Sequence, residues 1–382
     1  MKRLSIPFLL LTWFHGFSQE GMIHSGMMRI YADGGIGLHT NLVNDGIFDG
    51  NWGLMGFYSD DEISISGNFV PMLHDMEVMT VNGLNLGISV SVENNQNFIL
   101  GNINTPRTDS FTTLTFQSDA FYAGAGDIRK VDGYVTFHGQ QNFVFPVGDS
   151  DQLRPLVIHS EDVNPEAKCA YFFEDPNNTV FFTTNFNTNV KASEIENITT
   201  LEFWNLQGSV PSTVQISWNA RSSIHRITNN PENIIIVGWN KSTHQWDSLG
   251  GVAIGDLVQG FVISNHFVPD DYEVLTFGTI NESEIIVDLP NSLLTPNGDG
   301  INDFLEISEL EQSPNNLVRV YDRNGLLVFK RTNYVNEFEG YATEGDVVIN
   351  RSKGLPSGVY FYLVNMHDLG TEYQGYLYLA KN

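Results

Sequence analysis

The densest group of residues that could do chemistry lies at 293–307, in the run LLTPNGDGINDFLEI. With Thr295 as the first position of a twelve-residue calcium loop, oxygen-bearing side chains stand at several ligand positions: Asn297, Asp299, Asp303 and Glu306. However, the first position holds threonine in place of aspartate, and the flanks read as strand and turn instead of helix. Asn and Asp side chains in such a run also hydrogen-bond their own backbone. We therefore expect a self-bonded loop, with calcium as an optional ligand and no other cofactor.

Other signatures of catalysis are sparse. The run SDDE at 59–62 supplies adjacent carboxylates of the kind that glycosidases and lyases use, although an exposed acidic turn has the same composition. The ten histidines occur singly, and the one cysteine, Cys169, excludes a Cys-based zinc site. Cys169 stands among strand-forming residues in AKCAYFF, which indicates a small buried side chain. No nucleophile elbow, phosphate loop or dinucleotide fingerprint is present, so we predict no catalytic residue.

The elements that must position these groups read as β-structure. Runs such as EISISGNFV and GYVTFHGQQNFVFPVG alternate apolar with polar residues, and 35 Gly and 14 Pro punctuate them. We predict an all-β protein with an N-terminal β-solenoid, a central β-sandwich-like region and a C-terminal immunoglobulin-like sandwich. The expected boundaries are 1–18 for a signal peptide, then 19–130, 131–284 and 285–382.

The segment 19–130 places short apolar pairs between Asn, Asp and Gly corners, as in NLVNDGIFDGNWGLMGFY. Staggered short strands with such corners are typical of a parallel β-solenoid, in which each rung stacks on the previous one. Because no strict repeat period is present, a sandwich of short strands is the alternative. Beyond residue 131 the strands lengthen, as in NIIIVGWN, which favours a sandwich.

Four tryptophans lie in or beside strands of the central segment: Trp204, Trp218, Trp239 and Trp246. Tryptophan on a sandwich strand packs in the core more often than it forms a sugar-binding platform, which is the alternative. Asp149 and Arg154 flank the turn after Pro146, and we expect them to pair across it.

The net charge of the chain bears on its possible partners, and the N-terminal residues bear on its location. The chain of 382 residues carries 45 acidic and 19 basic residues, a formal net charge of −26, which excludes nucleic acid as a partner. Lys2 and Arg3 precede an apolar run at 6–14 and small residues before Gln19, the anatomy of a secretory signal peptide. No later run is apolar enough to cross a membrane, so we expect no transmembrane segment in the mature chain.

The segment 285–382 is the most legible part of the sequence. LVRVYDRNGLLVFK predicts a β-hairpin, because Asn324-Gly325 supplies the positive backbone angles of a tight turn. GLPSGVYFYLV and GYLYLA read as further strands. About five to seven strands in this length make a sandwich of immunoglobulin-like size.

The segment 285–382 resembles the gliding-motility-associated C-terminal domain, which is the type B sorting domain of the type IX secretion system of Bacteroidota. The runs that carry this resemblance are, in order, IIVDLPNSLLTPNGDGINDFLEI, VRVYDRNGLLVF, NEFEG, LPSGVYFYLV and GYLYLAKN. The positions that carry this resemblance are Thr295, Pro296, Asn297, Gly298, Asp299, Gly300, Asn302, Asp303, Gly325, Gly340, Pro356, Gly358 and Gly375. Two positions depart from the family, which usually has an aromatic residue where Asn324 stands and WDG where this chain has FEG. Both departures keep the turn glycine.

The resemblance implies a function in export. A signal peptide would carry the chain through the inner membrane, and the outer-membrane translocon of type IX secretion would then recognise the folded C-terminal domain. The protein would be secreted or held at the cell surface. We expect the passenger to be adhesin-like or structural, with surface glycans or other cells as partners. A secreted glycan-active enzyme or a carbohydrate-binding protein is the alternative.

Overall fold

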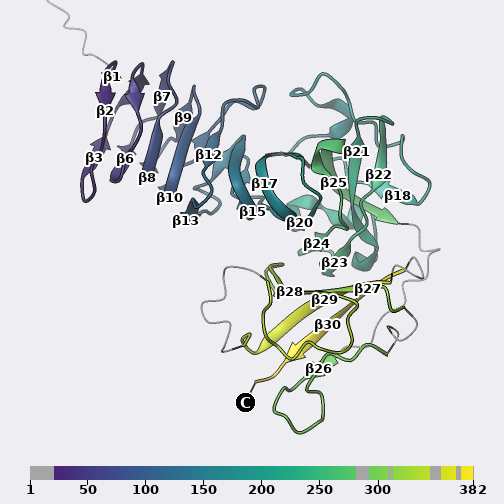
Figure 1. The fold of residues 1–382 in the computed structure, drawn as a ribbon. Coiled ribbons are helices and arrows are strands. Elements are labelled where there is room, and N and C mark those ends of the chain that lie inside the picture. Colours follow the sequence, from purple (N-terminus) through teal and green to yellow (C-terminus); the bar gives the residue numbers. More distant parts are fainter. Residues whose placement is uncertain are drawn as a thin grey trace, which may run out of the picture.

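The computed structural model describes residues 21–280, 292–308, 310, 313–344, 354–366 and 371–381, so the predicted signal peptide lies outside the described residues. The described chain is all-β, as predicted, and forms a stacked N-terminal region, a central region and a C-terminal sheet (Figure 1). Its helical elements are short 3-10 turns: η1 (Pro176–Asn178), η2 (Ala220–Ser222), η3 (Ile224–Arg226), η4 (Pro231–Asn233) and η5 (Pro269–Asp271). In these ranges no helix is both long and apolar enough to cross a membrane.

The N-terminal region is the predicted β-solenoid, built from two parallel sheets whose strands stack rung on rung. One sheet contains, in order, β1 (Gly21–His24), β4 (Asn41–Asn44), β7 (Ile63–Gly67), β9 (Leu84–Leu86), β11 (Ile103–Asn104), β14 (Val131–Asp132) and β16 (Val147–Gly148). The other contains β3 (Gly35–Leu38), β6 (Leu54–Ser59), β8 (Met72–Thr80), β10 (Val90–Leu100), β12 (Leu114–Phe116), β13 (Phe121–Ala123) and β15 (Val135–Phe145). A two-residue pair, β2 (Met27–Met28) with β5 (Ile47–Phe48), lies at a corner.

Buried asparagines link the solenoid rungs at their corners. Asn51 is 1% exposed; its Oδ1 accepts from the N–H of Ile30 at 2.7 Å and its Nδ2 donates to the carbonyl of Met72 at 2.6 Å. One side chain therefore connects the preceding and the following rung. Gly101 is needed at another corner: its φ is +81°, and a Cβ there would lie 1.6 Å from the carbonyl oxygen of Thr80.

The parallel stacking continues beyond residue 130, where the sequence suggested a boundary. β14 pairs with β11 and with β16, and β12 pairs with β15, all in parallel. The change comes at β17 (Leu156–Phe172), which runs antiparallel to β15 and continues the same sheet into the central region. Alternating apolar residues are compatible with both a parallel solenoid and an antiparallel sheet, so the sequence pattern does not show where one changes to the other.

The central region is antiparallel and branches from β17. It contains β18 (Ile195–Ile198), β19 (Phe203–Gly208), β20 (Ser212–Trp218), β21 (Ile234–Asn240), β22 (Gln245–Ser248), β23 (Val252–Gly255), β24 (Gly260–Ile263) and β25 (Tyr272–Ile280). The first half of β17 pairs with β20 and its second half with β19, so one strand serves two arms. All four central tryptophans are at most 5% exposed, which confirms the packing interpretation. Cys169 is buried and free, also as predicted.

The C-terminal region is one five-stranded sheet with its own core. Its strands are β26 (Ser292–Leu294), β27 (Asn316–Tyr321), β28 (Leu327–Thr332), β29 (Gly358–Met366) and β30 (Thr371–Leu379), arranged in the order β26-β30-β29-β27-β28. Within the described ranges, segments without strand structure cover one face and bury Leu305, Tyr334 and Phe338 against it. The other face turns toward β23 and β24 of the central region (Figure 1).

Candidate functional site

The side chain of Asp303 organises the loop 295–303. Its Oδ1 accepts hydrogen bonds from the backbone N–H groups of Asn297 (2.9 Å) and Gly298 (2.8 Å), and its Oδ2 accepts from Gly300 (2.8 Å). Three backbone donors of a tight loop thus converge on one carboxylate. These bonds, from Gly298 first and then from Gly300, hold the pKa of Asp303 below its usual value.

The backbone of the loop explains its small residues. Gly298 and Gly300 have φ values of +79° and +84°, and Asn302 has +54°, all in the left-handed region. The N–H of Thr295 donates to the carbonyl of Asn302 at 2.7 Å and closes the base of the loop. The self-bonded arrangement expected from the sequence is therefore the one observed.

Calcium binding by Asn297, Asp299, Asp303 and Glu306 stays a prediction. The carboxylate of Asp303 already accepts three N–H donors, and Glu306 is exposed beyond the loop. Over the described part of the chain, no group of three or more His, Cys, Asp or Glu side chains is placed to hold a metal ion. The loop keeps its shape through its own hydrogen bonds.

Tyr334 joins the segment after the loop to the turn of the FEG run. Its hydroxyl donates to the carbonyl of Leu305 at 2.6 Å and accepts from the N–H of Phe338 at 3.1 Å. The N–H of Leu305 donates to the carbonyl of Phe338 at 2.9 Å. Gly340, with φ of +78°, follows and accepts from the N–H of Leu355 at 2.8 Å. One buried phenol therefore fixes two of the sequence runs that carry the resemblance.

The predicted hairpin is confirmed, and its turn differs from the expectation. The N–H of Gly325 donates to the carbonyl of Asp322 at 2.9 Å, and that of Asp322 donates to the carbonyl of Leu326. Only Gly325, with φ of +80°, is left-handed, whereas Asn324 keeps a negative φ. This pattern is a type I turn followed by a glycine bulge, which needs one positive angle instead of two.

The remaining motif positions lie along β29 and β30. Gly375 pairs with Tyr362 across the two strands, and a Cβ on Gly375 would lie 2.3 Å from the Tyr362 hydroxyl. The carbonyl of Pro356 accepts from the hydroxyl of Tyr360 at 2.9 Å. Gly358 begins β29 with open space where a Cβ would be, so the structure gives no steric reason for glycine there.

Comparison with known families agrees with this geometry: residues 287–379 match the family model of the CHU_C Type IX secretion signal domain. This C-terminal unit is a type IX secretion sorting domain. The protein is accordingly exported to the cell surface or released, and the secretion machinery is its partner. No curated protein and no solved structure matches the chain.

The sorting domain packs directly on the passenger through an apolar seam. Ile263 of β24 packs with Tyr321 of β27 and Leu363 of β29, all at most 5% exposed. Next to them, the rings of Phe261 and Phe361 meet edge to face at 5.7 Å. The face of the sorting sheet that turns away from its own core is thus partly covered by the passenger.

Polar contacts fix the hairpin turn of the sorting domain in the same seam. Nε2 of His159 donates to the carbonyl of Gly325 at 3.1 Å, and Nε2 of Gln215 donates to the carbonyl of Asn324 at 3.2 Å. Burial lowers the pKa of His159, while the hydrogen bond to Gly325 opposes this shift. The sequence offered no signal for these contacts, because their two sides are separated by 166 and 109 residues.

Two arginine–carboxylate pairs of the passenger line one cavity. A cavity of about 260 Å³ is lined by Arg107, Asp132, Asp149 and Arg221, among others. Nε of Arg107 donates to Asp132 at 3.0 Å, and Nη1 of Arg221 donates to Asp149 at 2.9 Å. The SDDE run begins at Ser59, the last residue of β6, and its three acidic residues lie exposed between β6 and β7.

The expected pairing of Asp149 with Arg154 is wrong. Asp149 pairs with Arg221, whereas Nη2 of Arg154 donates to the carboxylate of Glu202 at 2.7 Å in the buried core. The hydroxyl of Tyr171 donates to the same carboxylate at 2.7 Å. The two partners, Arg221 in η2 and Glu202 just before β19, are 72 and 48 residues away in the sequence, so proximity in the sequence was misleading.

Proposed function

We propose that the region upstream of the sorting domain is a non-enzymatic passenger, adhesin-like or structural, displayed outside the cell. The observation that carries the proposal is the regular solenoid, whose rungs are joined by buried asparagines such as Asn51. A stack of this kind presents a long, stiff surface and suits a spacer or adhesive module. The pairing of arginines with carboxylates in the passenger cavity also supports it, because those carboxylates are occupied.

The proposal is tested with the exported protein and with cells that display it. We expect cells that produce the chain to attach to surfaces or to other cells better than cells that lack it. We expect the purified protein to release no reducing ends from a panel of polysaccharides. Protein-dependent release of reducing ends would contradict the proposal and favour a glycan-active enzyme.

Carbohydrate binding is a second candidate because one tryptophan is exposed on the solenoid. Trp52 is 65% exposed and packs against the ring of His74 at 5.4 Å, which fixes its orientation. An exposed, oriented indole face suits stacking on a sugar ring. Binding on a glycan array that is competed by free sugar and lost in Trp52→Ala would support this candidate. Equal binding by Trp52→Ala and the unaltered protein would contradict it.

A further inference from the structure

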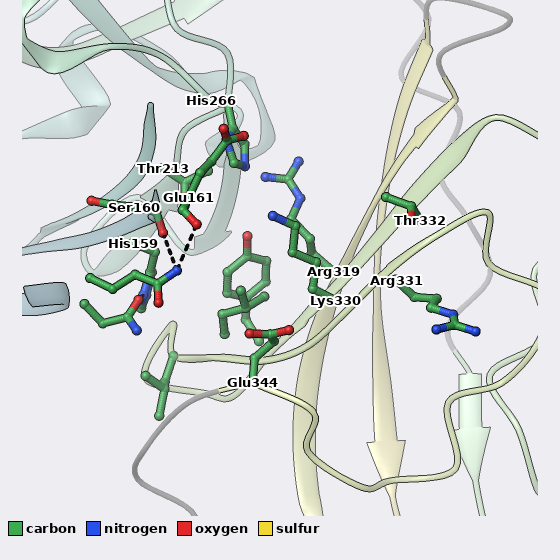
Figure 2. Close-up of a pocket in the computed structure, with 15 residues that line it drawn as sticks. His159, Ser160, Glu161, Thr213, His266, Arg319, Lys330, Arg331, Thr332 and Glu344 are labelled. Carbon is green, nitrogen blue, oxygen red and sulfur yellow. Dashed lines mark hydrogen bonds and ion pairs between the residues drawn. The ribbon is translucent and has the colours of Figure 1, made fainter. Parts of the chain in front are cut away.

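The seam between passenger and sorting domain encloses a polar cavity of about 400 Å³ (Figure 2). The passenger contributes Glu161 and His266 to its wall, and the sorting domain contributes Arg319 of β27 and Lys330 of β28. In Figure 2 the two cationic side chains reach from the sorting sheet toward the passenger side. The cavity therefore belongs to neither domain alone.

Arg319 is a buried cation whose hydrogen-bonding capacity is only partly used. The residue is 2% exposed, and its Nη2 donates to Oδ1 of Asn365 at 2.6 Å. Its Nε and Nη1 atoms have no hydrogen-bond partner in the structure. Burying charged donors without acceptors is costly, and native proteins avoid it unless water or an ion completes the site.

Neither carboxylate of the cavity forms an ion pair with Arg319 or Lys330. Oε1 of Glu161 lies 2.9 Å from Nδ1 of His266, and no carboxylate in the described ranges lies within 4 Å of a side-chain nitrogen of Arg319 or Lys330. Glu344 also lines the cavity outside ion-pairing distance. Burial and then the charge of Arg319 lower the pKa of His266 to about 4, while Glu161 opposes this shift. The guanidinium of Arg319 is thus the charge that acts most strongly on this imidazole.

A neighbouring arginine provides a natural comparison. Arg331, next in the chain to Lys330, also lines the cavity but pairs with Glu337 at 2.6 Å and is directed away from the seam (Figure 2). Its charge is thus compensated within the sorting domain. The uncompensated pair consists of Arg319 and Lys330.

We propose that this cavity binds an oxyanion group, a sulfate, phosphate or carboxylate, between Arg319 and Lys330. The fork of a guanidinium presents two parallel N–H donors to two oxygens of such a group, and a lysine ammonium adds a point charge. Since the cations come from the sorting domain and the opposite wall from the passenger, the bound group also bridges the two. It is either a free inorganic anion or the anionic substituent of a glycan.

The test is titration calorimetry of the full exported chain at pH 7 with sodium sulfate, with sodium phosphate and with a sulfated disaccharide, against sodium chloride of equal ionic strength. We expect saturable binding that chloride does not reproduce. Arg319→Gln should weaken it by about tenfold or more, because two charge-assisted hydrogen bonds are lost. Arg331→Gln should bind as the unaltered protein does. Tighter binding of the disaccharide than of sulfate would identify a glycan, and equal binding would identify a free anion.

Two results would overturn the proposal. One is the absence of any saturable heat beyond that of chloride. The other is unchanged affinity in both Arg319→Gln and Lys330→Gln. Lys330 is only half-buried, so we expect Lys330→Gln to fold normally. This variant therefore tests the proposal even if Arg319→Gln does not fold.

Discussion

Replacing Tyr334 by phenylalanine removes one oxygen atom from the centre of the sorting domain. The residue is 1% exposed, and its hydroxyl serves the carbonyl of Leu305 and the N–H of Phe338. Both of those residues are at most 1% exposed, so water does not replace the lost partner. The ring keeps its edge-to-face contact with Phe329 at 6.0 Å. The change therefore isolates two hydrogen bonds.

The expected cost follows from the two backbone groups left unpaired. Each buried, unsatisfied group costs about 1–3 kcal/mol, so Tyr334→Phe should lower the free energy of unfolding of the sorting domain by about 2–6 kcal/mol. Amide hydrogen exchange that occurs through opening of this domain should then accelerate by about 30- to 20,000-fold. The measurement is hydrogen–deuterium exchange of the β27–β30 amides in the full chain.

Tyr373→Phe is the matched control. Tyr373 lies in β30, packs against the same core and is only partly buried, and no hydrogen bond of its hydroxyl is present in the structure. Its replacement should change exchange by no more than a few fold. Acceleration below about fivefold in Tyr334→Phe, or an equal effect in both variants, would refute the reasoning, since fivefold corresponds to about 1 kcal/mol.

Three further predictions concern the passenger, the loop and a turn. Glu202→Gln should destabilise the passenger by about 3–5 kcal/mol in denaturant unfolding, because Arg154 stays buried without its counter-charge. The double variant Arg154→Met, Glu202→Leu should lose much less stability, because no buried charge remains. Equal losses of stability in the two proteins would contradict this prediction. The ionised carboxylate of Asp303 stabilises the loop 295–303, and its pKa is lower in the folded than in the unfolded chain. This stabilisation should be fully present above the unfolded pKa of about 3.9, and it should be lost as the pH falls through the folded pKa. Amide chemical shifts of the loop followed by NMR should show this titration, and Asp303→Asn should abolish it. Gly340→Ala should cost about 1 kcal/mol or more in unfolding of the sorting domain, because an L-residue is strained at φ of +78°; an unchanged stability would contradict it.

Local patterns in the sequence predicted the parts of the structure that local physics determines. Alternating strands, Asn and Gly corners and the hairpin were recognisable because each depends on a few adjacent residues. Asn51 illustrates the limit: its corner position was readable, but its bonds to Ile30 and Met72 depend on the stacking of neighbouring rungs. In the hairpin, the glycine was recognised correctly, whereas the backbone angle of Asn324 depends on the bulge that follows.

Features that depend on distant pairings could not be predicted. The partner of Arg154 is Glu202, which directly precedes β19 and reaches Arg154 only because β19 pairs with β17. The same holds for the seam, where Arg319 reads in the sequence as one more polar residue of a hairpin. Its burial becomes visible only when the sorting sheet is placed on the passenger.

The central claim is that the C-terminal domain addresses this protein for type IX secretion. It is tested most directly by fusing a reporter to residues 285–382 behind a signal peptide and locating it in hosts with and without that secretion system. We predict that the reporter reaches the cell surface or the medium only in the competent host. Retention in the periplasm of both hosts, or appearance outside both, would contradict the account.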